Sequence, residues 1–480
     1  MASKSSASSA VGRCWVNRPH MARWWHNDVQ QRAGSATLPP VTATGWSLEP
    51  DLLFLNHGSF GACPVVVLET QQAWRERLER QPVRFLAREL EAALDDARAV
   101  LGGFVGADPD DLAFVPNATH GVNTVLRSLR FAPGDELLTD DHAYNASLNA
   151  LRAAAERDGA TVVVVSVPFP TAGPEEVLRA LLKAVTPRTR LALVAHVTSP
   201  TALVFPVAEI AAAFAARGIQ VLVDGAHAPG MLPLDIRALE AAGVDYYTGN
   251  GHKWLCAPKG SGFLWVRRDH QPDIRPLAIS HGANSPRRDR SRFRLEFDWT
   301  GTADPTPYLS IPAAIEAMGA LLPGGWPALM AANHEAVVAA RQVILDRLGV
   351  ASPAPPTMLG SMASILLPPP GPAAAAFAPN LGTSPLDDDP LQLELRERWR
   401  IEVPILPWPP QRRMVRISAQ AYVPADAWVT LADALADVLA LPARPSGGTP
   451  PGAAGGAPAA SPARPSPAPD RPRTTRPDRR

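Results

Sequence analysis

The chain of 480 residues contains very little lysine. Lysine and arginine together number 46, but lysine stands only at Lys4, Lys183, Lys253 and Lys259, so the other 42 (46 minus 4) are arginine. Arginine supplies the same positive charge, but its guanidinium stays protonated and cannot act as an amine nucleophile. Two of the four lysines share one glycine-rich stretch, "GNGHKWLCAPKGSG" at 249–262. This stretch is either a surface loop with two lysines or a site where an amine forms a covalent bond.

The chain also has few cysteines and no formal net charge. The three cysteines, Cys14, Cys63 and Cys256, form no disulfide framework and no CxxC zinc site, so we predict a reducing cytoplasm and no metal. The formal net charge is zero, which argues against a nucleic-acid partner. No apolar run of about 18 residues is present, so no membrane span is expected. The N-terminus lacks the apolar core of a signal peptide.

Apolar runs alternate with helical patterns over most of the chain. Residues 65–105 carry apolar side chains at helical spacing. From residue 112 six short apolar runs follow, mostly separated by helical segments: "DLAFVPN", "GDELLTD", "TVVVVSV", "RLALVAHV", "IQVLVDGAH" and "GSGFLWVR". Such runs are typical of parallel strands that are buried on both faces. We therefore predict an α/β fold, a mainly parallel sheet between helices, with its ligand beyond the carboxyl ends of the strands.

The pattern changes after about residue 305. A long helical segment and then mixed strands and helices, such as "SMASILLP" and "RMVRISAQAYV", predict a smaller C-terminal α+β domain at 305–442. It follows a large α/β domain at 46–304. Proline, with 52 residues, is concentrated in 443–480, and this tail has no apolar periodicity, so we predict that it is disordered. Residues 1–45 are predicted to form an irregular N-terminal arm.

Polar residues coincide with two predicted strand ends. Asp224 lies at the end of the predicted buried strand in "VLVDGAHAPG". An acidic side chain in this position needs a cationic partner or hydrogen bonds. A turn aspartate is the common alternative. Asn117, Ala118 and Thr119 lie at a strand-to-helix junction. Backbone N–H groups at a helix start bind phosphate well, although an N-cap alone would explain the asparagine.

The order of these features points to one cofactor. A phosphate cradle comes first, a strand-end aspartate second and Lys253, between Asn250, His252 and further glycines, third. Each feature alone is weak. Together they suit pyridoxal phosphate, which needs its phosphate anchored, its pyridinium paired and its aldehyde held by an amine.

The same stretches carry a family resemblance. "VDGAHAPG" and "TGNGHKWLCAPKGSGFLWV" resemble the class V aminotransferase family of fold-type I pyridoxal-phosphate enzymes. "FLNHGSFGACP", "PVRFLAREL" and "FDWTGTADPTPYLSIPAAI" resemble its isopenicillin N epimerase-like branch, and the similarity spans residues 50–440. The chain departs from the family at Ala202, where glycine is common.

The resemblance implies a cofactor role for each matching position. Lys253 would hold the aldehyde as an imine and then carry the substrate α-proton, and Asp224 would pair with the pyridinium. His142 or Tyr144 would stack on the cofactor, and His142 is preferred. His227 would lie near the ring edge. The remaining cofactor-binding positions, most of them around the phosphate, are Asn117, Ala118, Thr119, Ser199, Asn250 and His252.

The resemblance also implies substrate contacts and a partner. Arg416 would clamp the substrate α-carboxylate, which suits a bidentate guanidinium, and Asn56 and His57 would face the substrate. In relatives a Gly-Thr pair from the neighbouring subunit completes the phosphate site. Gly301 and Thr302 match that pair, so a homodimer with a shared active site is expected.

Several reactions are open to such a protein. We predict an epimerase, which must deliver protons to both faces of the α-carbon: Lys253 on one, and Tyr144, His142, His57 or a water on the other. A C–S β-lyase, which needs no second acid, and an aminotransferase are alternatives, and so is a non-catalytic relative on the same fold. A cysteine desulfurase is disfavoured because no cysteine follows Cys256, and a nicotinamide dehydrogenase because no suitable GxGxxG is present.

Overall fold

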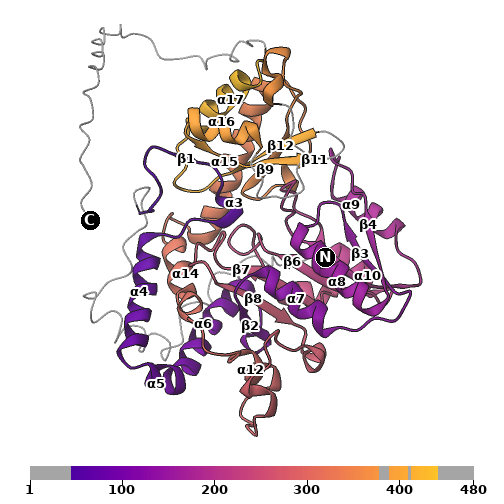
Figure 1. Cartoon of the computed structure of the whole chain (residues 1–480), viewed down its shortest axis with the longest axis vertical. Coiled ribbons are helices and arrows are strands. Elements are labelled where there is room, and N and C mark those ends of the chain that lie inside the picture. The colour runs from indigo at the N-terminus through magenta and orange to yellow at the C-terminus, as the bar shows by residue number, and fades with distance from the viewer. Residues whose placement is uncertain (1–44, 378–388, 409–411, 442–480) are drawn as a thin grey trace, which may run out of the picture. The chain divides into compact units, whose positions relative to one another are not determined.

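The computed structural model describes residues 45–377, 389–408 and 412–441 (Figure 1). The predictions of an N-terminal arm and of a disordered C-terminal tail lie almost wholly outside these residues. No described helix is long and apolar enough to cross a membrane.

A seven-stranded sheet forms the centre of the larger part of the chain, with the strand order β2-β8-β7-β6-β5-β3-β4. The strands from β7 to β4 are parallel, and β8 is antiparallel to both of its neighbours. The predicted α/β fold with a mainly parallel sheet is confirmed. The strands are β2 (Leu112–Val115), β3 (Glu136–Asp140), β4 (Thr161–Val165), β5 (Thr189–Ala195), β6 (Gln220–Gly225), β7 (Tyr246–Asn250) and β8 (Gly262–Val266).

Helices cover both faces of this sheet, which explains the continuous apolar runs. Along β6, Leu222 joins one hydrophobic core, while Val221 and Val223 join the other. The first core includes residues of α7 (Ala118–Ser128), α8 (Asn145–Asp158) and α12 (Arg292–Phe297). The second includes residues of α4 (Val65–Arg80), α6 (Leu90–Val105), α9 (Pro174–Lys183), α10 (Val207–Ala215), α11 (Ile236–Ala242) and α14 (Ile311–Gly319).

A separate core joins the C-terminal elements. Its antiparallel sheet has the order β11-β12-β9, and α15, α16 and α17 pack with it. The short strand β1 (Leu53–Phe54) pairs with β10 (Ile401–Glu402), so residues from the start of the described chain belong here too. The other elements are β9 (Met362–Leu366), β11 (Ile405–Trp408), β12 (Arg412–Ser418), α15 (Gly325–Leu348), α16 (Pro390–Arg398) and α17 (Ala427–Val438). The predicted boundary at 304/305 stays a prediction.

A short N-terminal helix, α3 (His57–Phe60), leads into a turn that packs directly on the lysine-bearing loop. Gly61 has φ +70°, and a Cβ there would lie 2.2 Å from the carbonyl oxygen of His252 and 3.0 Å from the Cα of Lys253. Only glycine fits both the backbone conformation and the space.

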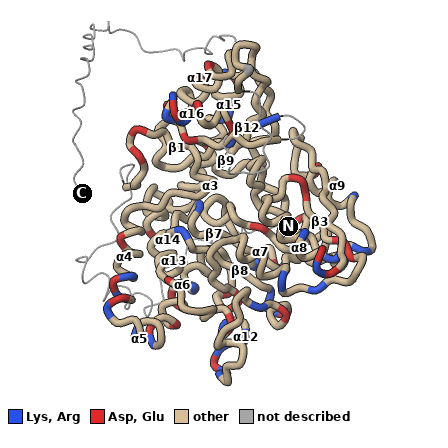
Figure 2. Tube along the Cα trace, viewed as in Figure 1, with Lys and Arg blue, Asp and Glu red and all other residues tan. Residues whose placement is uncertain are grey.

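Figure 2 shows charged residues mainly on outer helices such as α5 (Pro82–Arg84) and α12, whereas β7 and β8 carry none.

Candidate active site

The candidate site is a cavity of about 260 Å³ at the carboxyl ends of the central strands. Five strands end beside it: β2, β3, β5, β6 and β7. β2 belongs to this group because it runs in the same direction as the parallel strands. This is the position where open α/β sheets bind ligands. The lining residues are Ser59, Phe60, Asn117, Ala118, Thr119, Tyr144, Ala195, Val197, Ser199, Asp224, Ala226, His227, Asn250, His252 and Lys253.

Lys253 presents its amine to this cavity from the turn that follows β7. The Nζ atom lies 3.0 Å from Nε2 of His227. Burial, together with the positive charge of Arg416, lowers the pKa of Lys253 to about 7. Burial also lowers the pKa of His227 well below its usual value, so this imidazole is neutral. The amine is therefore available as a nucleophile and as a base near neutral pH.

Asp224 is buried at the end of β6 and lines the same cavity. Its Oδ2 accepts a hydrogen bond from the Ser147 hydroxyl at 2.7 Å, and its Oδ1 accepts one from the Ala226 amide at 3.2 Å. Each oxygen keeps a further lone pair for a ligand. A buried carboxylate in this position suits a cationic ring nitrogen.

The start of α7 supplies an anion site to the cavity. Asn117 is the N-cap, and its side chain accepts the amide of His120 at 2.9 Å. The Asn250 Oδ1 accepts the amide of Ala118 at 2.8 Å, which ties the end of β7 to this helix start. His252 donates from Nδ1 to the carbonyl of Ser261, at 3.2 Å. These residues suit a phosphate group at a helix N-terminus.

Tyr144, and not the preferred His142, lines the cavity. Tyr144 is 44% exposed and is the N-cap residue of α8. His142 is fully buried, with Nδ1 2.7 Å from the hydroxyl of Thr201 and Nε2 3.1 Å from the carbonyl of Val167. Both ring nitrogens of His142 are thus engaged in the protein interior. Of the two candidates, the structure therefore places the tyrosine ring at the cavity, and the stacking role itself stays a prediction.

Arg416, on β12, reaches the wall of the cavity through two serines. Its Nη1 donates to the carbonyl and hydroxyl oxygens of Ser199 at 2.7 and 3.1 Å, and its Nη2 donates to the hydroxyl of Ser59 at 2.8 Å. Burial lowers the pKa of Arg416 to about 10, with the nearby Tyr144 opposing that shift. The guanidinium keeps its charge at neutral pH, and both serines line the cavity.

The two other predicted substrate contacts lie behind the cavity wall. His57 is fully buried, with Nδ1 2.9 Å from the Tyr422 hydroxyl and Nε2 3.1 Å from the Lys253 carbonyl. Burial lowers the pKa of His57 to about 3, so it is neutral. Asn56 donates to Glu402 and accepts from Ser59. Both residues position α3 and the lysine loop, and neither lines the cavity.

Gly301 and Thr302 are exposed and do not line this chain's cavity.

Ala202, at the departure from the family pattern, has φ +58° and is fully buried. This left-handed conformation favours glycine, so the alanine is strained there.

Sequence reasoning missed several residues of the site. Ser59 and Phe60 follow the predicted Asn56 and His57 in "LNHGSF", so the motif was found but the two residues that face the cavity were not named. Three further lining residues lie at or just after strand ends: Ala195, Val197 and Ala226. Only this position in the sequence could have indicated that they line the cavity. Ser147 had no signal, because its partner lies 77 residues away.

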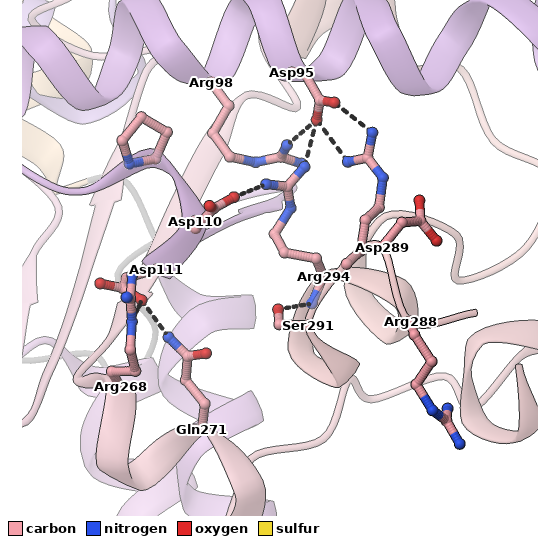
Figure 3. A pocket seen from close by; sticks show the side chains of 12 residues that line it. Asp95, Arg98, Asp110, Asp111, Arg268, Gln271, Arg288, Asp289, Ser291 and Arg294 are labelled. Carbon is pink, nitrogen blue, oxygen red and sulfur yellow. Dashed lines mark hydrogen bonds and ion pairs between the residues drawn. The ribbon is translucent and has the colours of Figure 1, made fainter. Parts of the chain in front are cut away.

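A larger cavity, of about 780 Å³, lies elsewhere, beside α6 and α12 (Figure 3). Its arginines are largely paired with carboxylates inside the protein: Arg294 with Asp95 and Asp110, and Arg268 with Asp111. The cavity lacks a lysine and the converging strand ends of the first one, so we regard it as an ion-pair network.

Comparisons with known proteins identify the class of this protein. The aminotransferase class-V family matches residues 54–300, which is more than half of the chain. The chain therefore belongs to this family and is a pyridoxal-phosphate-dependent enzyme, as the sequence predicted.

Similar proteins include two kinds of enzyme. An isopenicillin N epimerase of Streptomyces clavuligerus is 37% identical over 403 residues, covering 81% of this chain and 95% of the relative. A probable chloroplastic L-cysteine desulfhydrase of Arabidopsis thaliana is 33% identical over 411 residues, covering 81% and 83%. A solved structure of C-DES with glycine covalently linked to its pyridoxal-phosphate cofactor is 24% identical with a TM-score of 0.66, covering 81% and 97%. That likeness shows the fold.

The residues at the cavity fit the cofactor. The part-buried amine of Lys253 suits its aldehyde, the buried carboxylate of Asp224 suits its ring nitrogen, and the start of α7 with Asn250 and His252 suits its phosphate.

Proposed function

We propose that this enzyme is an isopenicillin N epimerase-like epimerase, acting at the α-carbon of an amino acid or an amino-acid-derived compound. One observation carries the proposal: Lys253 and Tyr144 line the same cavity from opposite sides of Asp224. Lys253 follows β7 and Tyr144 follows β3, and these strands lie on opposite sides of β6 in the sheet. A ring that met Asp224 with its nitrogen would lie between the strand ends that carry these two residues.

The two residues divide the proton transfer between them. When bound, the cofactor supplies an electron sink that makes the α-proton of the substrate acidic. Lys253, with a pKa of about 7, holds or gives up a proton near neutral pH on its side of the site. The Tyr144 hydroxyl is the group that returns a proton on the other side. Of the second-face residues predicted from the sequence, Tyr144 is the one that lines the cavity.

Substrate orientation falls to Arg416. Its guanidinium is held by Ser59 and Ser199, so it is already directed along the cavity wall before a ligand arrives. A carboxylate that displaces one of the serine hydroxyls gains a charge-assisted hydrogen bond. This contact would fix the α-carbon between Lys253 and Tyr144.

The test follows both the α-hydrogen and the stereochemistry in deuterated water. Candidate substrates are L- and D-amino acids, L-cysteine and isopenicillin N, first screened by spectral shift of the bound cofactor. The proposal expects deuterium at the α-carbon together with formation of the opposite configuration. Tyr144→Phe keeps the ring but removes the proton donor, so racemisation should fall far more than exchange. Tyr308→Phe, whose ring stacks on Phe114, is the matched control and should leave both unchanged. Exchange that proceeds without racemisation in the parent enzyme contradicts the proposal.

A C–S β-lyase is the second candidate, and the desulfhydrase relative is the observation that favours it. This reaction needs a base on one face, which Lys253 alone supplies. The same incubation separates it from the first candidate: L-cysteine and water would give pyruvate, ammonia and hydrogen sulfide. An aminotransferase would need a keto-acid acceptor and would release none of these.

We also propose a homodimer in the cytoplasm. Gly301 and Thr302 are exposed on the described surface, as they must be to reach a partner's phosphate site. Cys63 and Cys256 are free, buried thiols, in keeping with a reducing compartment. Sedimentation should give twice the chain mass, and a monomer would refute the shared site.

A further inference from the structure

We propose that Ser147 is a positioning residue that fixes the carboxylate of Asp224 for the cofactor. Its hydroxyl donates to Oδ2 of Asp224 at 2.7 Å, and its residue is 2% exposed. The other carboxylate oxygen takes the amide of Ala226. With one donor on each oxygen, the plane of the carboxylate is set before the cofactor binds. The inference depends on the cofactor and not on which reaction the enzyme performs.

Ser147 stands at an apolar position of its helix. It lies on the buried side of α8, one turn before Leu151 and in line with Ala154 and Ala155. A serine early in a helix commonly caps its own backbone, but this hydroxyl bonds a residue 77 positions away on β6. A polar side chain on an apolar stripe is costly unless its hydrogen bond is made. The contact with Asp224 is that bond.

The contact has two expected effects on the cofactor. A directed carboxylate meets the ring nitrogen without reorganisation, which strengthens binding. A donated hydrogen bond also stabilises the negative charge of the carboxylate, and this charge would keep the proton on the ring nitrogen. The same helix begins beside Tyr144, so α8 places both this cavity-lining tyrosine and the support of the carboxylate.

The experiment measures cofactor binding and titration in the full-length protein. Ser147→Ala removes the donor, and Ser147→Cys keeps the size with a much weaker donor. We expect Ser147→Ala to weaken pyridoxal-phosphate binding about tenfold and to move the pH midpoint of the visible absorption band up by about one unit. Ser147→Cys should move both values in the same direction by less. Ser128→Ala removes a helix serine that bonds backbone carbonyls and should move neither.

A purely structural serine would behave differently. It would lower the unfolding temperature of Ser147→Ala while the affinity and the band midpoint stayed at the parent values, and that result overturns the proposal. If Ser147→Ala does not fold, Ser147→Cys decides by the same two readouts. Parent protein that binds no pyridoxal phosphate overturns the proposal at its foundation. Parent protein that binds it but performs no epimerisation leaves the Ser147 result valid and refutes only the proposed reaction.

Discussion

The surroundings of Lys253 explain why an arginine-rich chain keeps a lysine there. The amine lies 3.0 Å from the neutral ring of His227, it is surrounded by protein, and Arg416 is close enough to repel a positive charge. An arginine would remain charged in this place and would have no nucleophilic lone pair. The environment therefore favours the free amine, which is the form that reacts with an aldehyde.

This environment predicts a pH dependence for cofactor capture. Because the folded-state pKa of Lys253 is lowered from 10.5 to about 7, the reactive amine appears as the pH rises through about 7. After removal of the cofactor, the rate of reaction with pyridoxal phosphate should climb through that pH and level off above it. Stopped-flow absorbance measures the rate, with Lys253→Ala as the blank. A midpoint above pH 9 contradicts the lowered pKa.

At this scale the sequence predicted residue types better than side-chain directions. Lys253, Asp224 and Asn250 were identified because each lies in a short motif at a strand end. His142 and Tyr144 share one strand-to-helix turn, so sequence alone could not decide between them. The direction of the His142 side chain depends on residues distant in the sequence, because Thr201 and Val167 bind its two ring nitrogens.

Among the elements, runs of β-branched residues were easy to predict and β7 was not. Its sequence, "YYTGN", has two aromatics, a glycine and no valine or isoleucine, so it did not resemble a buried parallel strand. It is nonetheless fully buried, because it lies inside the sheet between β6 and β8. Tertiary position decided its structure, and it carries Asn250 and leads to Lys253.

The contact between α6 and α12 predicts an effect on stability. Asp298, which follows α12, pairs with Arg98 of α6 and with Arg294, and both arginines are almost fully buried. Asp298→Asn takes one carboxylate from both buried arginines and leaves them to share Asp95, so we expect a loss of about 3 kcal/mol in the free energy of unfolding. Asp110→Asn also removes a partner of Arg294, but Asp110 is 71% exposed, so its loss should stay below about 1 kcal/mol. Urea unfolding followed by circular dichroism compares them, and equal losses would contradict this account.

For the whole molecule, the site joins parts that lie far apart in the sequence. Ser59 comes from α3, Lys253 from the turn after β7 of the large sheet and Arg416 from the small C-terminal sheet. The bond between Arg416 and Ser199 spans 217 positions. Motifs predicted the fold class and many of the residues that line the cavity, but contacts of this length depend on how the elements pack. For that reason the roles of Ser59 and Ser147 emerged only from the structure.

The most direct test of the central claim is the visible absorption spectrum of the purified protein beside its Lys253→Ala and Lys259→Ala variants. Lys259 is the matched control, since it shares the glycine-rich stretch but donates to the carbonyl of Gly61 at 2.7 Å. The account predicts a yellow parent protein with a band that borohydride bleaches, an unchanged band in Lys259→Ala and its loss in Lys253→Ala. A parent that stays colourless after addition of pyridoxal phosphate, or a band that survives in Lys253→Ala, would contradict the assignment of this lysine as the cofactor's covalent partner.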